Sequence, residues 1–110
     1  MYERGAVWTA RIPEVGVKPV VILSDQTVTL ALRPIAARIT SVERPRTVPT
    51  SVALAPGEIE GLAEHSYILC HDLMTVQDGG LVEHLGAVSR ERIIEIEDRL
   101  AFVFGMGDSL

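Results

Sequence analysis

Three polar residues stand beside apolar segments in the N-terminal half of the chain and could together hold an anion. Lys18 opens the apolar run that ends at Ser24, while Arg38 and Thr40 alternate with apolar residues in the segment 35–41. Because alternate residues of a strand point to the same side, Arg38 and Thr40 share one face. With Lys18 at the mouth of the neighbouring strand, an ammonium, a guanidinium and a hydroxyl could all touch one phosphate group. This arrangement suits a polar site on the rim of a small β-barrel, while Lys18 also fits a solvated strand start and Thr40 an ordinary strand residue.

Further polar residues follow the Thr40 position. Ser41 is the next residue, so it points to the opposite face unless a bulge intervenes. Arg44 and Arg46 flank Pro45 in the loop 43–49 and suit contact with phosphate groups, with plain surface charge as the alternative.

Charge is divided unevenly between the two halves of the chain. Residues 1–57 hold seven Lys or Arg against four Asp or Glu, whereas residues 58–110 hold three against eleven, and the net charge is −5. The net value argues against a general nucleic-acid binder. The division predicts an N-terminal half that can face an anion and a C-terminal half that repels one.

Short apolar segments with a period of two predict a succession of strands. Residues 25–32 are ambiguous, residues 56–66 form a polar connection with room for one helical turn at 59–63, and residues 81–88 fit either a strand or a helical turn. The expected strands are 7–12, 18–24, 35–41, 51–54, 67–70 and 74–76.

One C-terminal helix is predicted after these strands. Ser89 is a good N-cap residue, Glu95 and Arg99 are spaced for an i,i+4 ion pair, and Gly105 is placed to end the helix. One helical face carries the apolar residues Ile93, Ile96, Leu100, Val103 and Phe104. A single domain over residues 1–110 follows, mainly β with a helix packed on the sheet.

Composition restricts the other kinds of site. Cys70 is the one cysteine, so no internal disulfide is possible, and its place in an apolar run predicts a buried structural thiol. Trp8 alternates with apolar residues, which favours core packing over stacking on a base. No histidine spacing suits a metal, and no apolar run is long enough for a membrane span. A cytoplasmic location is expected, because no secretory signal opens the chain.

Five segments in order resemble the MazF/PemK family of toxin ribonucleases. They are RGAVW at 4–8, KPVVILS at 18–24, RITS at 38–41, RTVPTSV at 46–52 and LVEHLG at 81–86. The resemblance implies a small SH3-like β-barrel of the CcdB/MazF type with a C-terminal α-helix.

The resemblance also implies a chemistry for the candidate residues. Family members cleave single-stranded RNA selectively without a metal or cofactor, by attack of the ribose 2′-OH on the adjacent phosphate. On this chain the implied catalytic residues are Lys18 and Thr40. The implied RNA-binding residues are Arg38, Ser41, Arg44 and Arg46. A homodimer, RNA bound across it and a MazE-like antitoxin with an acidic tail are the implied partners.

The chain departs from the family pattern at three positions. Lys18 stands where an Arg is more usual, and Asp72 and Met74 replace the Gln and Arg of a common Gln-x-Arg-Thr stretch. Asp72 and Met74 support one alternative to a nuclease, an antitoxin-binding homologue without nuclease activity. A second alternative is a gyrase-binding toxin of the same fold.

Overall fold

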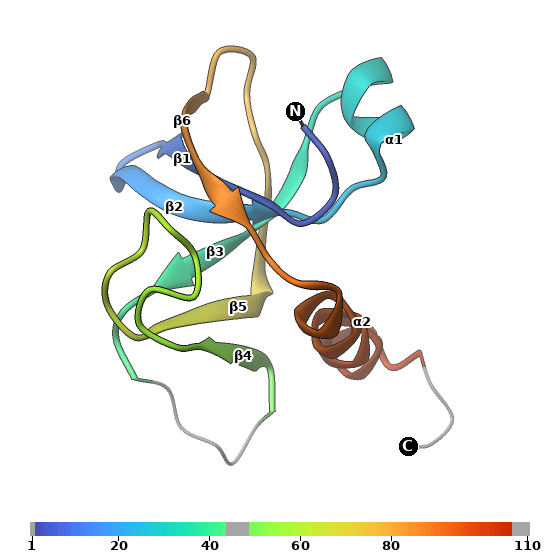
Figure 1. Cartoon of the computed structure of the whole chain (residues 1–110). Helices are drawn as coiled ribbons and strands as arrows, with labels where there is room; N and C mark the ends of the chain where they lie inside the picture. Colours follow the sequence, from blue (N-terminus) through green and yellow to red (C-terminus); the bar gives the residue numbers. More distant parts are fainter. Residues whose placement is uncertain (1, 44–48, 107–110) are drawn as a thin grey trace.

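The computed structural model describes residues 2–43 and 49–106, and this part of the chain forms six strands and two helices. Figure 1 shows their arrangement, with the C-terminal helix below one side of the sheet. The strands are β1 (Ala6–Ile12), β2 (Gly16–Ile22), β3 (Ile35–Thr40), β4 (Ser51–Leu54), β5 (Ser66–Thr75) and β6 (Leu81–Ala87). The helices are α1 (Gln26–Ala31) and α2 (Arg90–Phe104).

All six strands belong to one antiparallel sheet in the order β4-β5-β3-β2-β1-β6. The sheet is strongly coiled, and the β6-β1-β2 half crosses the β3-β5-β4 half, as Figure 1 shows. This is the expected mainly β fold with a C-terminal helix. The central pair β2 and β3 matters for function, because Val20 lies opposite Arg38. Lys18 and Thr40 lie beyond this paired stretch on the same two strands.

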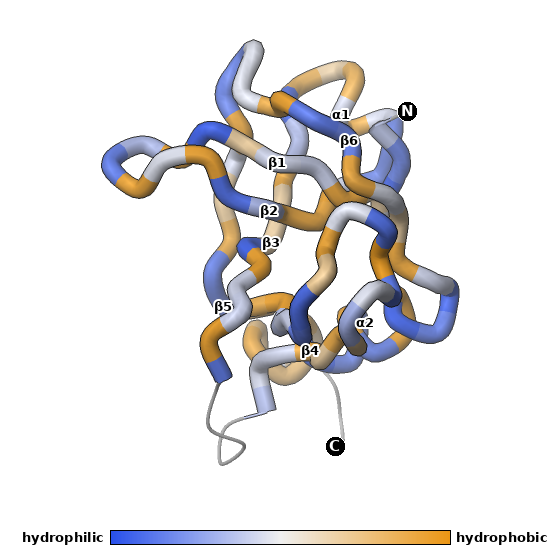
Figure 2. The backbone as a smooth tube through the Cα atoms, turned by 60° about the vertical axis from the view of Figure 1, so that its left-hand side comes forward, coloured by the Kyte–Doolittle hydropathy of each residue, from blue (hydrophilic) through white to orange (hydrophobic). Residues whose placement is uncertain are grey.

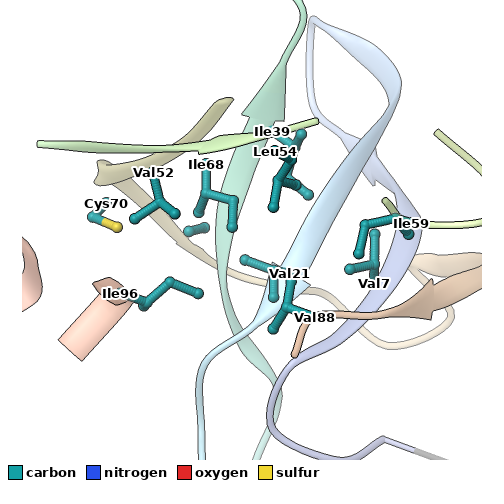
Figure 3. Close-up of a cluster of buried hydrophobic side chains, with 11 residues drawn as sticks. Val7, Val21, Ile39, Val52, Leu54, Ile59, Ile68, Cys70, Val88 and Ile96 are labelled. Atoms are coloured by element: carbon teal, nitrogen blue, oxygen red, sulfur yellow. The ribbon is translucent and has the colours of Figure 1, made fainter. Parts of the chain in front are cut away.

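The main core fills the space enclosed by the coiled sheet and α2. Figure 3 shows the side chains of this core gathered together, and they come from β1 to β5, from α2 and from the connections around them. Its buried members are Val7, Val21, Ala37, Ile39, Val52, Leu54, Ile59, Ile68, Cys70, Val88 and Ile96. Ile59 belongs to the connection between β4 and β5, so that connection is attached to the core. The predicted burial of Cys70 is confirmed.

Alternation along the strands accounts for which residues are buried. Figure 2 shows hydrophobic and hydrophilic residues following one another along the strands. The predicted inward positions Val52 and Leu54 of β4 are both buried. Trp8 is 8% exposed and packs between the rings of Tyr2 and His84, so its predicted core role is confirmed.

Helix α2 has the predicted ends. Ser89 Oγ accepts a hydrogen bond from the backbone N–H of Arg92, and Gly105 ends the helix in the left-handed conformation with φ at 65°. Four of the five predicted apolar residues pack on the core, but Phe104 is 58% exposed. Neither described helix is long and apolar enough to pass through a membrane.

The predicted Glu95–Arg99 pair is wrong. Glu95 Oε1 instead accepts from Arg92 Nη1 at 2.6 Å, one turn earlier in the helix. Arg99 Nε donates to the backbone oxygen of Ser51 at 3.2 Å, which ties α2 to β4. The expected pair does not form because each residue is bonded elsewhere, Glu95 to Arg92 and Arg99 to the backbone of Ser51.

Two strand predictions also change. Residues 67–76 were expected to hold two strands, but β5 is continuous and carries a bulge. Leu73 lies opposite Ala37 and Leu69 opposite Arg38, so three residues of β5 bulge between neighbouring positions of β3. The ambiguous residues 25–32 contain α1, which Asp25 caps, and residues 81–87 form β6.

Candidate functional site

A pocket of about 310 Å³ opens where β2, β3 and the connection between β4 and β5 meet. It brings together four of the predicted site residues, Lys18, Arg38, Thr40 and Ser41. The opposite wall comes from residues 61–64 and from Ser66 at the start of β5. The pocket therefore has two strand walls and one wall made by a loop.

Lys18 lies inside β2 rather than at its start. The strand begins at Gly16, and Lys18 pairs with Ala10 of β1. The prediction that it opens the strand is wrong, because the hairpin with β1 extends two residues further than the apolar run indicates. Lys18 is nevertheless exposed and lines the pocket, and it is the only lysine of the sequence. Its ammonium group can therefore meet a ligand without loss of a structural partner.

Arg38 reaches the pocket from the middle of β3. Its Nε atom is buried and has no hydrogen-bond partner among the described residues. One terminal nitrogen, Nη1, lies 3.8 Å from Asp72 Oδ2 in the β5 bulge. A buried donor without an acceptor is costly, so a ligand oxygen bound in the pocket would satisfy it.

Thr40 is the last residue of β3, and its hydroxyl is already oriented. Thr40 Oγ1 accepts a hydrogen bond from the backbone N–H of Val42 at 3.2 Å. This bond uses one lone pair of the oxygen, and the hydroxyl hydrogen can be donated to a ligand. Ser41 lines the same pocket, contrary to the predicted opposite face. Strand alternation no longer governs Ser41, since β3 ends at Thr40.

The loop wall of the pocket is held by contacts with β6 and α2. Gly61 N donates to Leu85 O at 3.0 Å, and a Cβ on Gly61 would lie 2.7 Å from Leu85 Cβ. At the base of the loop, Glu58 and Arg92 form a bidentate ion pair. Arg92 Nε donates to Glu58 Oε2 at 2.8 Å, and Arg92 Nη2 donates to Glu58 Oε1 at 3.0 Å. These hydrogen bonds, above all, hold the pKa of Glu58 below its usual value.

Glu64 and its neighbours are the pocket residues that sequence reasoning missed. Residues 56–66 carry no strong periodicity and were predicted as a polar connection with room for one helical turn at 59–63. The structure has no helix within these described residues and instead pairs Ile59 with Leu62 in an isolated β-bridge. Arg44 and Arg46, the two remaining candidates, lie outside the described residues. Within residues 2–43 and 49–106, no three His, Cys, Asp or Glu side chains gather closely enough to hold a metal ion.

Comparison with solved structures finds the same fold in bacterial toxins. An endoribonuclease in complex with its cognate antitoxin, from a mycobacterial species, is 27% identical with a TM-score of 0.82, covering 97% of this chain and 98% of that one. An endoribonuclease from a mycobacterial species is 26% identical with a TM-score of 0.76, covering 97% and 94%. The MazE–MazF complex of Deinococcus radiodurans is 19% identical with a TM-score of 0.73, covering 96% and 95%, and supports the fold alone.

The family comparison agrees with the structures. No curated protein matches the sequence. The model of the PemK-like, MazF-like toxins of type II toxin-antitoxin systems matches residues 3–104, which include the whole described pocket. The described fold, the pocket and this match over most of the chain agree with one another, and the chain belongs to the family of PemK-like, MazF-like toxins.

Proposed function

We propose that this chain is an endoribonuclease toxin that cleaves single-stranded RNA selectively at the pocket between β2, β3 and the 61–64 wall. The observation that carries the proposal is the convergence of Lys18, Arg38 and Thr40 on one pocket. The family match and the likeness to mycobacterial endoribonucleases support the same reaction class.

The proposed reaction transfers the phosphate from O5′ to the 2′ oxygen of the preceding ribose. The 2′-O–P bond forms, the P–O5′ bond breaks, and the products are a cyclic phosphate and a 5′-OH end. Negative charge grows on the phosphate oxygens during this step, so fixed cations stabilise the transition state. Arg38 and Lys18 supply that charge, and the free hydroxyl hydrogen of Thr40 holds a phosphate oxygen.

Lys18 has a second proposed role. An ammonium group can release a proton to the departing O5′, which an arginine cannot readily do. The substitution of lysine for the usual arginine would then shift the chain toward acid catalysis by this residue. Ser41 contributes a further hydroxyl to the RNA-binding surface, and Arg44 and Arg46 are proposed to extend that surface.

The proposed partners follow from the same surface. An antitoxin with an acidic tail would compete with RNA for the cationic N-terminal half. In support, one of the similar endoribonucleases is in complex with its cognate antitoxin. RNA is proposed to bind across a homodimer. Cleavage of cellular RNA places the protein in the cytoplasm.

The experiment is cleavage of a long unstructured RNA by purified protein in EDTA, with product ends identified. The expected result is cleavage with a cyclic phosphate, and roughly a 100-fold or greater loss in Lys18→Ala and Thr40→Ala. Thr9→Ala is the matched control, because Thr9 lies on β1, accepts a hydrogen bond from Glu83 N and does not line the pocket. Equal cleavage by the pocket variants would refute the proposal.

Absence of cleavage by the wild type would refute the proposal in another way. Retained antitoxin binding in that protein would identify a binding module without nuclease activity. Inhibition of gyrase supercoiling would instead identify a gyrase-directed toxin.

A further inference from the structure

The proposed reaction needs a group that accepts the proton of the 2′-OH, and most pocket side chains cannot do so. Lys18 and Arg38 are cations, and the Thr40 oxygen already accepts the N–H of Val42. Ser41 and Ser66 offer only hydroxyls, which are weak bases. Glu64 is the one carboxylate that lines the pocket within the described residues.

Glu64 sits at a defined place because the backbone on both sides of it is held. Ser66 Oγ donates to the backbone oxygen of Glu64 at 3.0 Å, and Ser66 is buried at the start of β5. On the other side, Gly61 is bonded to Leu85 of β6, and Leu62 N donates to Ile59 O at 2.9 Å. The segment that carries the carboxylate is therefore fixed to the sheet at both ends.

The base of the same loop is fixed to α2. Glu58 binds Arg92 through two hydrogen bonds and accepts a third from Ala55 N at 3.0 Å. Ile59 is 2% exposed in the main core. A wall held by a core residue and an ion pair is positioned well enough to carry a reacting group.

We infer that Glu64 is the general base of the proposed ribonuclease reaction. The Glu64 carboxylate takes the proton from the 2′-OH as the 2′ oxygen attacks phosphorus. The electron pair of the broken P–O5′ bond stays on O5′, which takes a proton from the Lys18 ammonium. The proton on Glu64 then returns to Lys18 through solvent, so the enzyme is restored with no other reactant. This inference rests on the proposed function.

The charges around Glu64 fit that role. Lys18 of β2 and Arg38 of β3 line the same pocket from the strand side, so the two cations and the carboxylate can act on one phosphate group. Asp72 contacts Arg38 but is not among the pocket residues. His65, the next residue along the chain, is paired with the Tyr67 hydroxyl through Nδ1 at 3.3 Å and does not line the pocket.

The test compares Glu64→Gln and Glu64→Asp with the wild type on the same RNA. Glu60→Gln is the matched control, since Glu60 is exposed in the same loop and does not line the pocket. We expect kcat to fall roughly 100- to 10,000-fold in Glu64→Gln and less in Glu64→Asp. Affinity for an RNA with a 2′-deoxy cleavage site should be unchanged or higher in Glu64→Gln, because a negative charge is removed.

The direction of the change in cleavage rate separates catalysis by Glu64 from simple charge repulsion. If Glu64 merely repelled the RNA backbone, Glu64→Gln would cleave faster than wild type, and the inference would be wrong.

The outcomes separate the inference from the function on which it rests. Undiminished kcat in Glu64→Gln, with loss in Lys18→Ala and Thr40→Ala, overturns the role of Glu64 and leaves the nuclease assignment intact. A wild type that does not cleave overturns both.

Discussion

Arg38 of β3, which lines the pocket, forms an ion pair with Asp72 of the β5 bulge, with Nη1 3.8 Å from Oδ2. The bulge creates this contact, because Asp72 has no position opposite β3 in the strand register. Asp72 thus partly neutralises a cation that the proposed RNA site uses. Its position in the family commonly holds an uncharged Gln.

Asp72→Asn should therefore strengthen RNA binding. Removing the carboxylate leaves the Arg38 charge uncompensated, and a half-exposed ion pair of this kind contributes up to about 1 kcal/mol. We expect KM for RNA to fall by up to roughly fivefold at low salt, with a smaller change at high salt. Asp78→Asn is the control, because Asp78 pairs with Arg33 outside the pocket. A rise in KM would contradict this role for Asp72.

The ion pair of Glu58 with Arg92 should make stability depend on pH. Hydrogen bonds from Arg92 lower the pKa of Glu58 in the folded state. The pair therefore stabilises the fold above the unfolded-state pKa, and this contribution disappears as the pH falls through the folded-state pKa. Glu58→Gln should lower the free energy of unfolding by about 1 kcal/mol at neutral pH. Urea unfolding of both proteins at falling pH should show the difference shrinking, whereas a difference that grows in acid would refute the explanation.

Gly61→Ala tests whether close packing positions the pocket wall. The new Cβ would lie 2.7 Å from Leu85 Cβ and Cδ2, so the loop must move away from β6. Overpacking of this kind costs roughly 1–3 kcal/mol, and KM for RNA should rise as the wall shifts. The Gly61→Ala, Leu85→Gly double variant supplies the control, since it removes both clashing Leu85 atoms, Cβ and Cδ2, and should recover part of the lost affinity. No recovery would show that the clash with Leu85 is not the cause.

Cys70 should be unreactive while the protein is folded. Burial raises its pKa to about 11, against the opposing influence of Arg99. The thiolate is the reactive form, so alkylation by iodoacetamide at pH 8 should be roughly 100-fold slower than for a free thiol. Labelling with and without urea, followed by mass spectrometry, measures the ratio. Rapid labelling of the folded protein would show that the core around Cys70 opens.

Local patterns explain which parts of the fold could be predicted. The ends of α2 depend on Ser89 and Gly105, whose preferences act within a few residues. The burial of Val52 and Leu54 follows from strand alternation. Phe104 and the Glu95–Arg99 pair were mispredicted because helical spacing does not say where the core stops or which long-range partner is closer.

The sequence by itself determined the strand face that Arg38 and Thr40 share, the caps of α2 and the family to which the chain is related. Only the tertiary structure decided that Ser41 joins the pocket, that Asp72 reaches Arg38, and that Glu64 forms the opposite wall. The physical reason is the range of the interactions. Alternation and capping act between neighbours, whereas the wall depends on Glu58 meeting Arg92 across 34 residues and on Gly61 fitting against Leu85.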